Sequence, residues 1–188
     1  MKVFADPSAI VDVLQRGGVA VLPTDTIYGL HAVAANDAAV ARIAQLKGRD
    51  EAKRFVVIAA SVEQLRAFGA DVPAILEMLW PAPLTAVVRR GEGTIAARVP
   101  DLAWLRKLLE STGPLVSTSV NRSGDHPISS IDDVPRALQQ GVDAALDAGR
   151  LDGKPSTIVD FTGAAPHILR EGDPLFAQNL RKKLRISL

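Results

Sequence analysis

Short apolar runs alternate with segments of helical periodicity along the first half of the chain, and this alternation constrains the fold most. The run Val19–Leu22 predicts a buried strand, and Phe55–Ala60 predicts a second one. Between them, Asn36 can cap a helix whose apolar residues recur at helical spacing until Lys47 and Gly48. Strands that alternate with helices are typical of α/β proteins, in which helices cover the faces of a sheet.

Strand signals become denser in the second half of the chain. Further strands are predicted at 84–88, 95–99, 115–117, 144–146, 157–161 and 167–169, and helices near 7–16, 73–80, 101–110 and 133–140, with a short one from 61. Alternation followed by clustered strands favours an α/β domain with a mixed sheet over a regular doubly wound one. The basic tail Arg181–Arg185 is interpreted as a solvated end, with a weak contact to tRNA as the alternative.

Composition limits the functions that such a chain can have. With 188 residues, 47% of them hydrophobic, residues 1–188 are predicted to form a single domain with a sizeable core. A net charge of +1 argues against a general nucleic-acid or membrane binder, so any anion site must be local. Cysteine is absent, which excludes disulfides and fits a reducing cytoplasm. No signal peptide and no run of ~18 apolar residues is found, so a cytoplasmic protein without membrane spans is expected.

The segment 45–54 concentrates positive charge between a predicted helix and a predicted strand. Its four cations are Lys47, Arg49, Lys53 and Arg54. Cations that converge on one cleft neutralise a polyanion such as a triphosphate. A solvated charged turn is the alternative interpretation of the same residues.

Polar side chains recur where predicted strands begin or end. They are Thr24, Asp25, Thr26, Thr85, Thr94, Arg98, Ser117, Thr118, Ser119, Asn121, Ser156, Thr157 and Arg170. Each hydroxyl alone is explained by a turn or a helix cap, and each arginine by a surface ion pair. Their joint occurrence at strand ends favours a binding site. Phosphate-loop and hydrolase motifs are missing, and the three histidines lack metal-ligand spacing, so no metal site is predicted.

On the basis of these and neighbouring residues, the chain resembles the YrdC/TsaC family of threonylcarbamoyl-AMP synthases from about Gly17 to Gly172. Seven short motifs follow one another in the family's order. They are Pro23–Leu30, Lys47–Arg49, Trp80–Thr85, Arg98–Pro100, Ser119–Asn121, Ser156–Asp160 and Leu169–Gly172. The resemblance implies a single-domain YrdC-like fold, a twisted open mixed sheet with flanking helices and a basic concave cleft. The length matches short members without the extra C-terminal domain.

The resemblance also implies a nucleotidyltransferase reaction, in which ATP, L-threonine and bicarbonate give threonylcarbamoyl-AMP and pyrophosphate. The product would serve a tRNA-modifying transferase complex that acts on adenosine 37 of tRNAs reading ANN codons. By motif, the residues implied to bind threonine are Thr26, Arg98, Ser119 and Ser156. Those implied to bind ATP are Arg49, Lys53, Thr94, Asn121, Ser129 and Arg170, with Lys47 and Arg49 as catalytic residues.

The chemistry of this reaction suits these residue types. A carbamate formed from threonine and bicarbonate must attack the α-phosphorus of ATP, and both reactants are anions. Lys47, Arg49 and Lys53 are expected to reduce that repulsion and to stabilise pyrophosphate. Arg98 suits the threonine carboxylate in a bidentate pair, and Thr26 its hydroxyl. No general base is apparent, so positioning is expected to supply most of the rate, and Mg²⁺ is expected with ATP without a named protein ligand.

Two other functions remain open. A YciO-like paralogue of different specificity is one, because Gly153–Thr157 resembles that group. Those relatives generally lack the Lys-x-Arg and Ser-x-Asn pair that this chain retains, which favours the synthase. A double-stranded RNA-binding module is the other, although a near-neutral charge and 4% aromatic residues argue against it.

Overall fold

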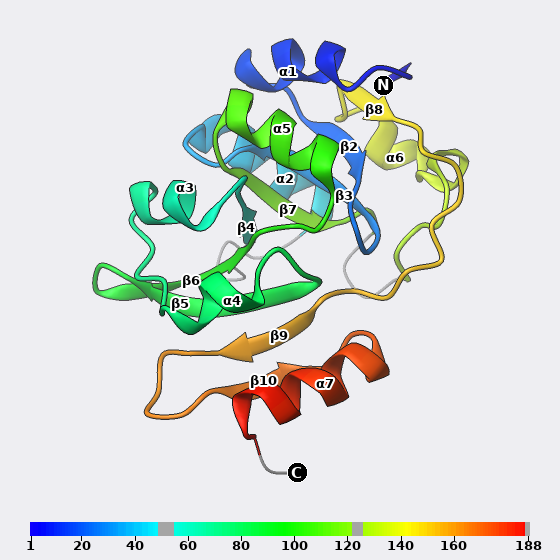
Figure 1. Ribbon diagram of the computed structural model, residues 1–188. Helices are drawn as coiled ribbons and strands as arrows, with labels where there is room; N and C mark the ends of the chain where they lie inside the picture. Colours follow the sequence, from blue (N-terminus) through cyan, green and yellow to red (C-terminus); the bar gives the residue numbers. More distant parts are fainter. Residues whose placement is uncertain (49–54, 122–125, 187–188) are drawn as a thin grey trace.

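The computed structural model describes residues 1–48, 55–121 and 126–186. Within them, ten strands form one twisted mixed sheet in the order β1-β8-β2-β3-β7-β4-β6-β5-β9-β10 (Figure 1). The strands are β1 (Lys2–Phe4), β2 (Ala20–Pro23), β3 (Tyr28–Val33), β4 (Val56–Ile58), β5 (Leu84–Arg90), β6 (Gly93–Arg98), β7 (Leu115–Ser119), β8 (Ala144–Leu146), β9 (Thr157–Asp160) and β10 (His167–Arg170). The α/β architecture with a mixed sheet, predicted from the sequence, is confirmed.

Strand register decides which side chains share a face of this sheet. Parallel pairs join β1 to β8, β8 to β2, β4 to β6 and β5 to β9, and the other neighbouring pairs are antiparallel. Between β4 and β7, Val56 lies opposite Ser117 and Val57 lies opposite Val116. Because side chains alternate along a strand, these two pairs point to opposite faces of the sheet.

Seven α-helices flank the sheet in the part of the chain that is described. They are α1 (Ser8–Gln15), α2 (Asp37–Lys47), α3 (Val62–Ala67), α4 (Ile75–Leu79), α5 (Ala103–Thr112), α6 (Arg136–Gln139) and α7 (Pro174–Leu184). Two of the helices begin at side-chain caps, since Asn36 accepts the Ala39 N–H at 3.0 Å and Ser61 accepts the Gln64 N–H at 3.2 Å. None of the described helices is long and apolar enough to cross a membrane.

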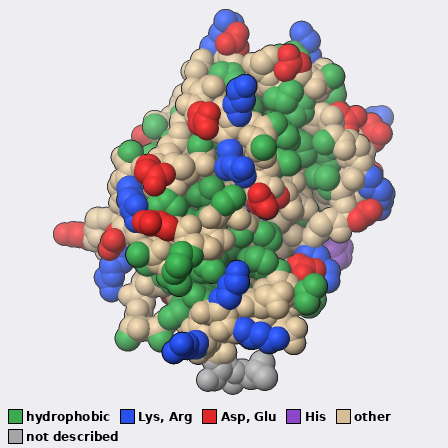
Figure 2. Space-filling model, in the orientation of Figure 1, with side chains coloured by type: hydrophobic (Ala, Val, Ile, Leu, Met, Phe, Trp, Pro, Cys, Tyr) green, Lys and Arg blue, Asp and Glu red, His purple; other side chains and the backbone are tan. Residues whose placement is uncertain are grey.

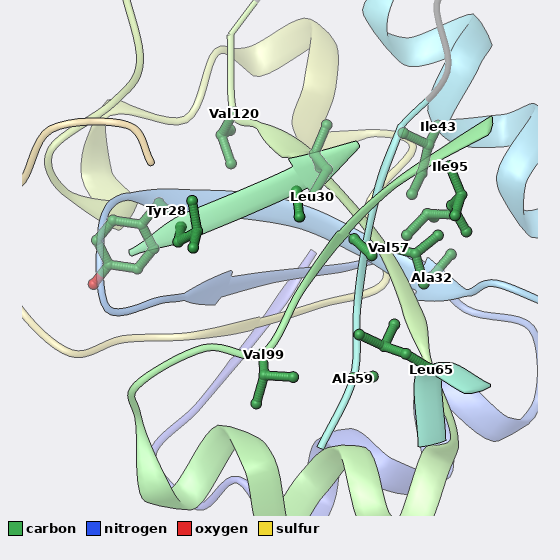
Figure 3. Close-up of a cluster of buried hydrophobic side chains, with 14 of the residues drawn as sticks. Tyr28, Leu30, Ala32, Ile43, Val57, Ala59, Leu65, Ile95, Val99 and Val120 are labelled. Carbon is green, nitrogen blue, oxygen red and sulfur yellow. The ribbon is translucent and has the colours of Figure 1, made fainter. Parts of the chain in front are cut away.

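Each face of the sheet contributes to its own core cluster. On one face Val57 and Val116 pack with Ile43 of α2 and Leu65 of α3, and Figure 3 shows part of this cluster. Burial of each such side chain contributes about 1.5–3 kcal/mol. On the other face, α1 and α5 cover a second cluster that includes Ile58 of β4. These two helices cover only part of that face, and the remainder carries the cavity described below.

The C-terminal segment forms a helix that was not predicted, and the Lys182, Lys183 and Arg185 side chains at its end are exposed, in line with the predicted solvated end. Asp173 caps α7 by accepting the Phe176 N–H at 2.9 Å, and Leu180 is buried against the core. The basic residues Arg181–Lys183 lie in the last turn, where cations favour the helix dipole. Lys and Arg side chains gather at the lower edge of the molecule in Figure 2, where α7 lies in Figure 1.

Candidate active site

A cavity of about 470 Å³ opens on the sheet face that α1 and α5 leave uncovered. Its floor is a row of side chains in register across four strands, namely Ser117, Val56, Ala96 and Val87. Val56 lies opposite both Ser117 and Ala96, and Ala96 lies opposite Val87. Arg98 follows Ala96 by two residues and therefore shares its face. The floor of the cavity is apolar except for the Ser117 hydroxyl.

The guanidinium of Arg98 is held by the loop between β2 and β3. Nη1 donates to Thr26 Oγ1 at 3.1 Å, and Nη2 forms an ion pair with Asp25. Asp25 is itself fixed, because its Oδ2 accepts the Asp101 N–H at 3.0 Å. The side chains of Arg98 and Asp25 are only 7% and 8% exposed. Within the described residues the buried Nε of Arg98 has no hydrogen-bond partner.

Arg170 brings a second guanidinium to the cavity from the end of β10. Its Nη2 donates to the Ser156 carbonyl at 2.9 Å. The backbone at position 172 also packs closely on this segment, since a Cβ at Gly172 would lie 2.1 Å from the Pro155 carbonyl oxygen. Burial and, secondarily, the positive charge of Arg98 lower the pKa of Arg170. Two cations that repel each other in one cavity favour the binding of an anion.

Hydroxyl and amide groups of the cavity wall form hydrogen-bonded pairs. Ser156 Oγ lies 2.8 Å from Thr85 Oγ1, and Ser119 Oγ donates to the Asn121 side-chain oxygen at 2.7 Å. Thr85 is fully buried, and Ser156 and Asn121 are nearly so. These bonds fix the direction of each polar group, which reduces the entropy lost when a ligand binds.

Residues distant in the sequence are brought together here. Six of the residues expected to bind substrate line the cavity: Thr26, Arg98, Ser119, Asn121, Ser156 and Arg170. Thr94 instead lines a second cavity of about 790 Å³ next to α2 and Phe68. Ser129 lines neither cavity, and its carbonyl accepts the Leu151 N–H at 2.8 Å. Arg49 and Lys53 lie outside the described residues.

Lys47, the last residue of α2, lies behind the cavity wall and is only 3% exposed. Its Nζ donates to the Ser119 carbonyl at 2.8 Å and to the Asn121 carbonyl at 2.5 Å. It also donates to the Asn121 side-chain oxygen. One ammonium therefore holds Ser119, the last residue of β7, and Asn121, two residues beyond it, a positioning contact that the basic segment alone does not predict.

The sequence placed Asp25 and Ser117 among the polar residues near strand ends without a specific role for either, and it assigned no role to His31. Asp25 pairs with Arg98, a residue 73 positions later, and no local pattern signals such a pair. His31 is fully buried, and its Nε2 lies 3.1 Å from Ser117 Oγ. The alternation of each strand places His31 and Ser117 on definite faces, but only the pairing of β3 with β7 makes them neighbours.

Burial of His31 predicts a dependence of stability on pH. Burial, with a smaller effect of the Arg98 charge, lowers its pKa from 6.5 to about 4. Because the unfolded chain binds this proton near pH 6.5 and the folded chain only near pH 4, stability is complete above pH 6.5 and falls between these values. The expected loss is about 3 kcal/mol. Urea denaturation from pH 7 to pH 4 should show a shallower decline for His31→Gln than for the wild type.

The exposed His167 provides the control for this measurement. His167→Gln should keep the wild-type decline between pH 6.5 and pH 4. Equal slopes for His31→Gln and the wild type would contradict a neutral, buried His31.

The fold and the cavity together define an α/β protein with a polar cavity lined by two arginines. The Sua5/YciO/YrdC family model, which is described as "Telomere recombination", matches residues 12–172. Since that match spans most of the sequence, the chain belongs to the Sua5/YciO/YrdC family.

Individual relatives agree with this assignment. A threonylcarbamoyl-AMP synthase of Chromohalobacter salexigens is 40% identical over 168 residues, which cover 80% of this chain and 90% of the relative. One of Pyrococcus abyssi is 33% identical over 175 residues, which cover 85% of this chain and 52% of the relative. The crystal structure of P. abyssi Sua5 complexed with L-threonine has a TM-score of 0.87 and 30% identity, over 97% of this chain and 60% of that one. The chain thus spans about half the length of the P. abyssi relative.

Proposed function

We propose that this protein is a threonylcarbamoyl-AMP synthase, a nucleotidyltransferase that converts ATP, L-threonine and bicarbonate to threonylcarbamoyl-AMP and pyrophosphate. The observation that carries the proposal is the convergence of Arg98, Arg170 and the hydroxyls of Thr26, Ser119 and Ser156 on one cavity. Relatives named for this activity, and a solved relative that holds L-threonine, support the choice of substrates.

Threonine is proposed to bind around Arg98, with its carboxylate against the guanidinium. Both terminal nitrogens of that guanidinium already bond Thr26 and Asp25, so a bidentate contact would share Nη2 with Asp25. A guanidinium fixed in this way needs little reorganisation to receive a carboxylate. The hydroxyls of Ser119 and Ser156 lie in the same cavity and complete the proposed threonine site.

ATP is proposed to place its phosphates between Arg170 and Asn121, which lie in the cavity. Lys47 supports this part of the site by fixing Asn121. The remaining ATP-binding residues are carried over from the family motifs alone, namely Arg49, Lys53, Thr94 and Ser129.

The proposed reaction proceeds in two steps. The threonine amine and bicarbonate form a carbamate with loss of water, and a carbamate oxygen then bonds to the α-phosphorus as the bond to the β-phosphate breaks. Arg98 and Arg170 would offset the repulsion between these anions, and positioning would supply much of the remaining rate. His31 is a poor general base, because its pKa is about 4 and its ring is buried.

Further partners follow from the same proposal. Any Mg²⁺ would be held mainly by ATP phosphates, because the described residues contain no cluster of three His, Asp or Glu side chains that could hold a metal ion. The product would pass to a tRNA-modifying transferase complex in the cytoplasm. Residues 1–188 are proposed to act as one YrdC-like domain, and a weak RNA contact through the basic turn of α7 stays a hypothesis.

The test is threonine-dependent release of pyrophosphate by the purified full chain. Release should require ATP, bicarbonate and L-threonine together, and mass spectrometry should detect threonylcarbamoyl-AMP. Turnover with another amino acid in place of threonine would favour the YciO-like alternative. Salt-sensitive binding of double-stranded RNA without any adenylate product would favour the RNA-binding module.

A further inference from the structure

His31 and Ser117 form a cross-strand pair at the cavity floor. They lie opposite each other on β3 and β7, with His31 Nε2 at 3.1 Å from Ser117 Oγ. The imidazole has no exposed surface, and within the described residues its Nδ1 has no partner. Gly29 leaves room for the ring, because a Cβ there would lie 2.7 Å from His31 Cε1. The buried His31 imidazole therefore contacts the Ser117 hydroxyl, which lines the cavity.

The pair resembles the nucleophile and base of a hydrolase, but its surroundings do not suit that role. The low pKa of His31, about 4, makes the ring neutral and weakly basic near neutral pH. Among the described residues no carboxylate contacts Nδ1 to stabilise an imidazolium. The neutral ring can instead orient the Ser117 hydroxyl by a single hydrogen bond.

The surroundings of Ser117 indicate the chemistry of the group it would contact. Val56 lies next to Ser117 in the floor row and Ala96 lies next to Val56, so the hydroxyl is at the edge of an apolar stretch. Such a surface fits a ligand group that carries both a hydroxyl and a methyl. Thr26, which was expected to bind the threonine hydroxyl, already bonds Arg98 at 3.1 Å and Thr24 at 2.9 Å.

We propose that Ser117, positioned by His31, determines specificity for the β-hydroxyl of the amino-acid substrate, while Val56 and Ala96 contact its methyl group. The inference rests on the proposed synthase function and adds a residue to its substrate site. Ser117 contacts substrate directly, and His31 acts through Ser117.

The test compares L-threonine with L-valine, in which a methyl replaces the hydroxyl. Calorimetry on the full chain gives the two affinities, and pyrophosphate release gives KM and kcat for threonine. Ser117→Ala should weaken threonine binding and raise its KM about tenfold, the effect of one lost hydrogen bond, with a much smaller change in kcat. Its affinity for valine should stay unchanged, so the preference for threonine falls by the same factor.

Variants of His31 test the positioning role. His31→Phe should reproduce the loss of preference, and His31→Gln, whose amide can replace Nε2, should restore most of it. Combining Ser117→Ala with His31→Phe should cost no more than Ser117→Ala alone, because both act through one hydroxyl. Additive losses in the double variant would overturn the role of His31.

Ser111→Ala, which removes an exposed hydroxyl from α5, is the matched control and should leave the preference unchanged. An unchanged preference in folded Ser117→Ala would overturn the inference even where His31 variants fail to fold. If the wild type turns over threonine in that experiment, the synthase function stands and only the inference fails. A wild type that neither binds threonine nor releases pyrophosphate would reject both.

Discussion

Replacing Asp25 by alanine is expected to lower the free energy of unfolding by about 3–5 kcal/mol. Asp25 and Arg98 form a nearly buried ion pair, and the second Asp25 oxygen accepts the Asp101 N–H at 3.0 Å. Removal of the carboxylate leaves a buried guanidinium without its counter-charge. Arg170 adds to the cost, because its positive charge lies close enough to Arg98 for its pKa to be lowered. Urea denaturation at pH 7, followed by circular dichroism, measures the loss.

Asp152→Ala is the matched control for this experiment. Asp152 forms an ion pair with Arg150, but the two side chains are 71% and 69% exposed. Such a pair contributes about 0–1 kcal/mol. A loss for Asp25→Ala no larger than the control's would show that the carboxylate does not hold Arg98 in place.

Lys47→Met is expected to slow pyrophosphate release at least about 100-fold, because a displacement of ~1 Å in a catalytic site has that effect. Methionine keeps the length of the side chain but removes the ammonium that joins the Ser119 carbonyl to both oxygens of Asn121. Each buried oxygen that loses its donor costs about 1–3 kcal/mol, so the end of β7 should shift or loosen. Initial rates at saturating ATP and threonine measure the effect.

Lys107→Met provides a control of the same chemistry on an exposed position of α5. It should keep the wild-type rate and stability. A folded Lys47→Met protein with the wild-type rate would remove Lys47 from the site, whatever its effect on stability.

Local signals in the sequence predicted many of the secondary-structure elements. The caps Asn36 and Ser61 accept the N–H groups expected of them, because a cap interacts with residues two or three positions away. The same reasoning could have found α7, since Asp173 is an N-cap residue followed by a proline in the first turn. The interpretation of this segment rested on its positive charge, so the helix was not predicted. Strand β1 was also missed, because its residues Lys2 and Val3 are exposed and it lacks a buried apolar run.

The residues of the candidate site were predicted less completely than the secondary-structure elements. Motif order identified six residues that the cavity gathers, including Arg98 and Arg170. Alternation along β6 predicted that Thr94 and Arg98 share one face of the strand, yet the two residues line different cavities. The alternation rule fixes a face, whereas the shape of a cavity depends on which neighbouring strands and helices cover that face.

By itself the sequence determined the α/β class, the family and most of the polar residues of the cavity, because periodicity, caps and ordered motifs are properties of the chain. Tertiary structure alone decided which of those groups are already paired. Asp25 meets Arg98, Lys47 meets Asn121, and His31 meets Ser117 only after strands distant in sequence are placed in register. These contacts determine which donors and hydroxyls face a ligand, since burial and charge at each position depend on neighbours that no local pattern specifies.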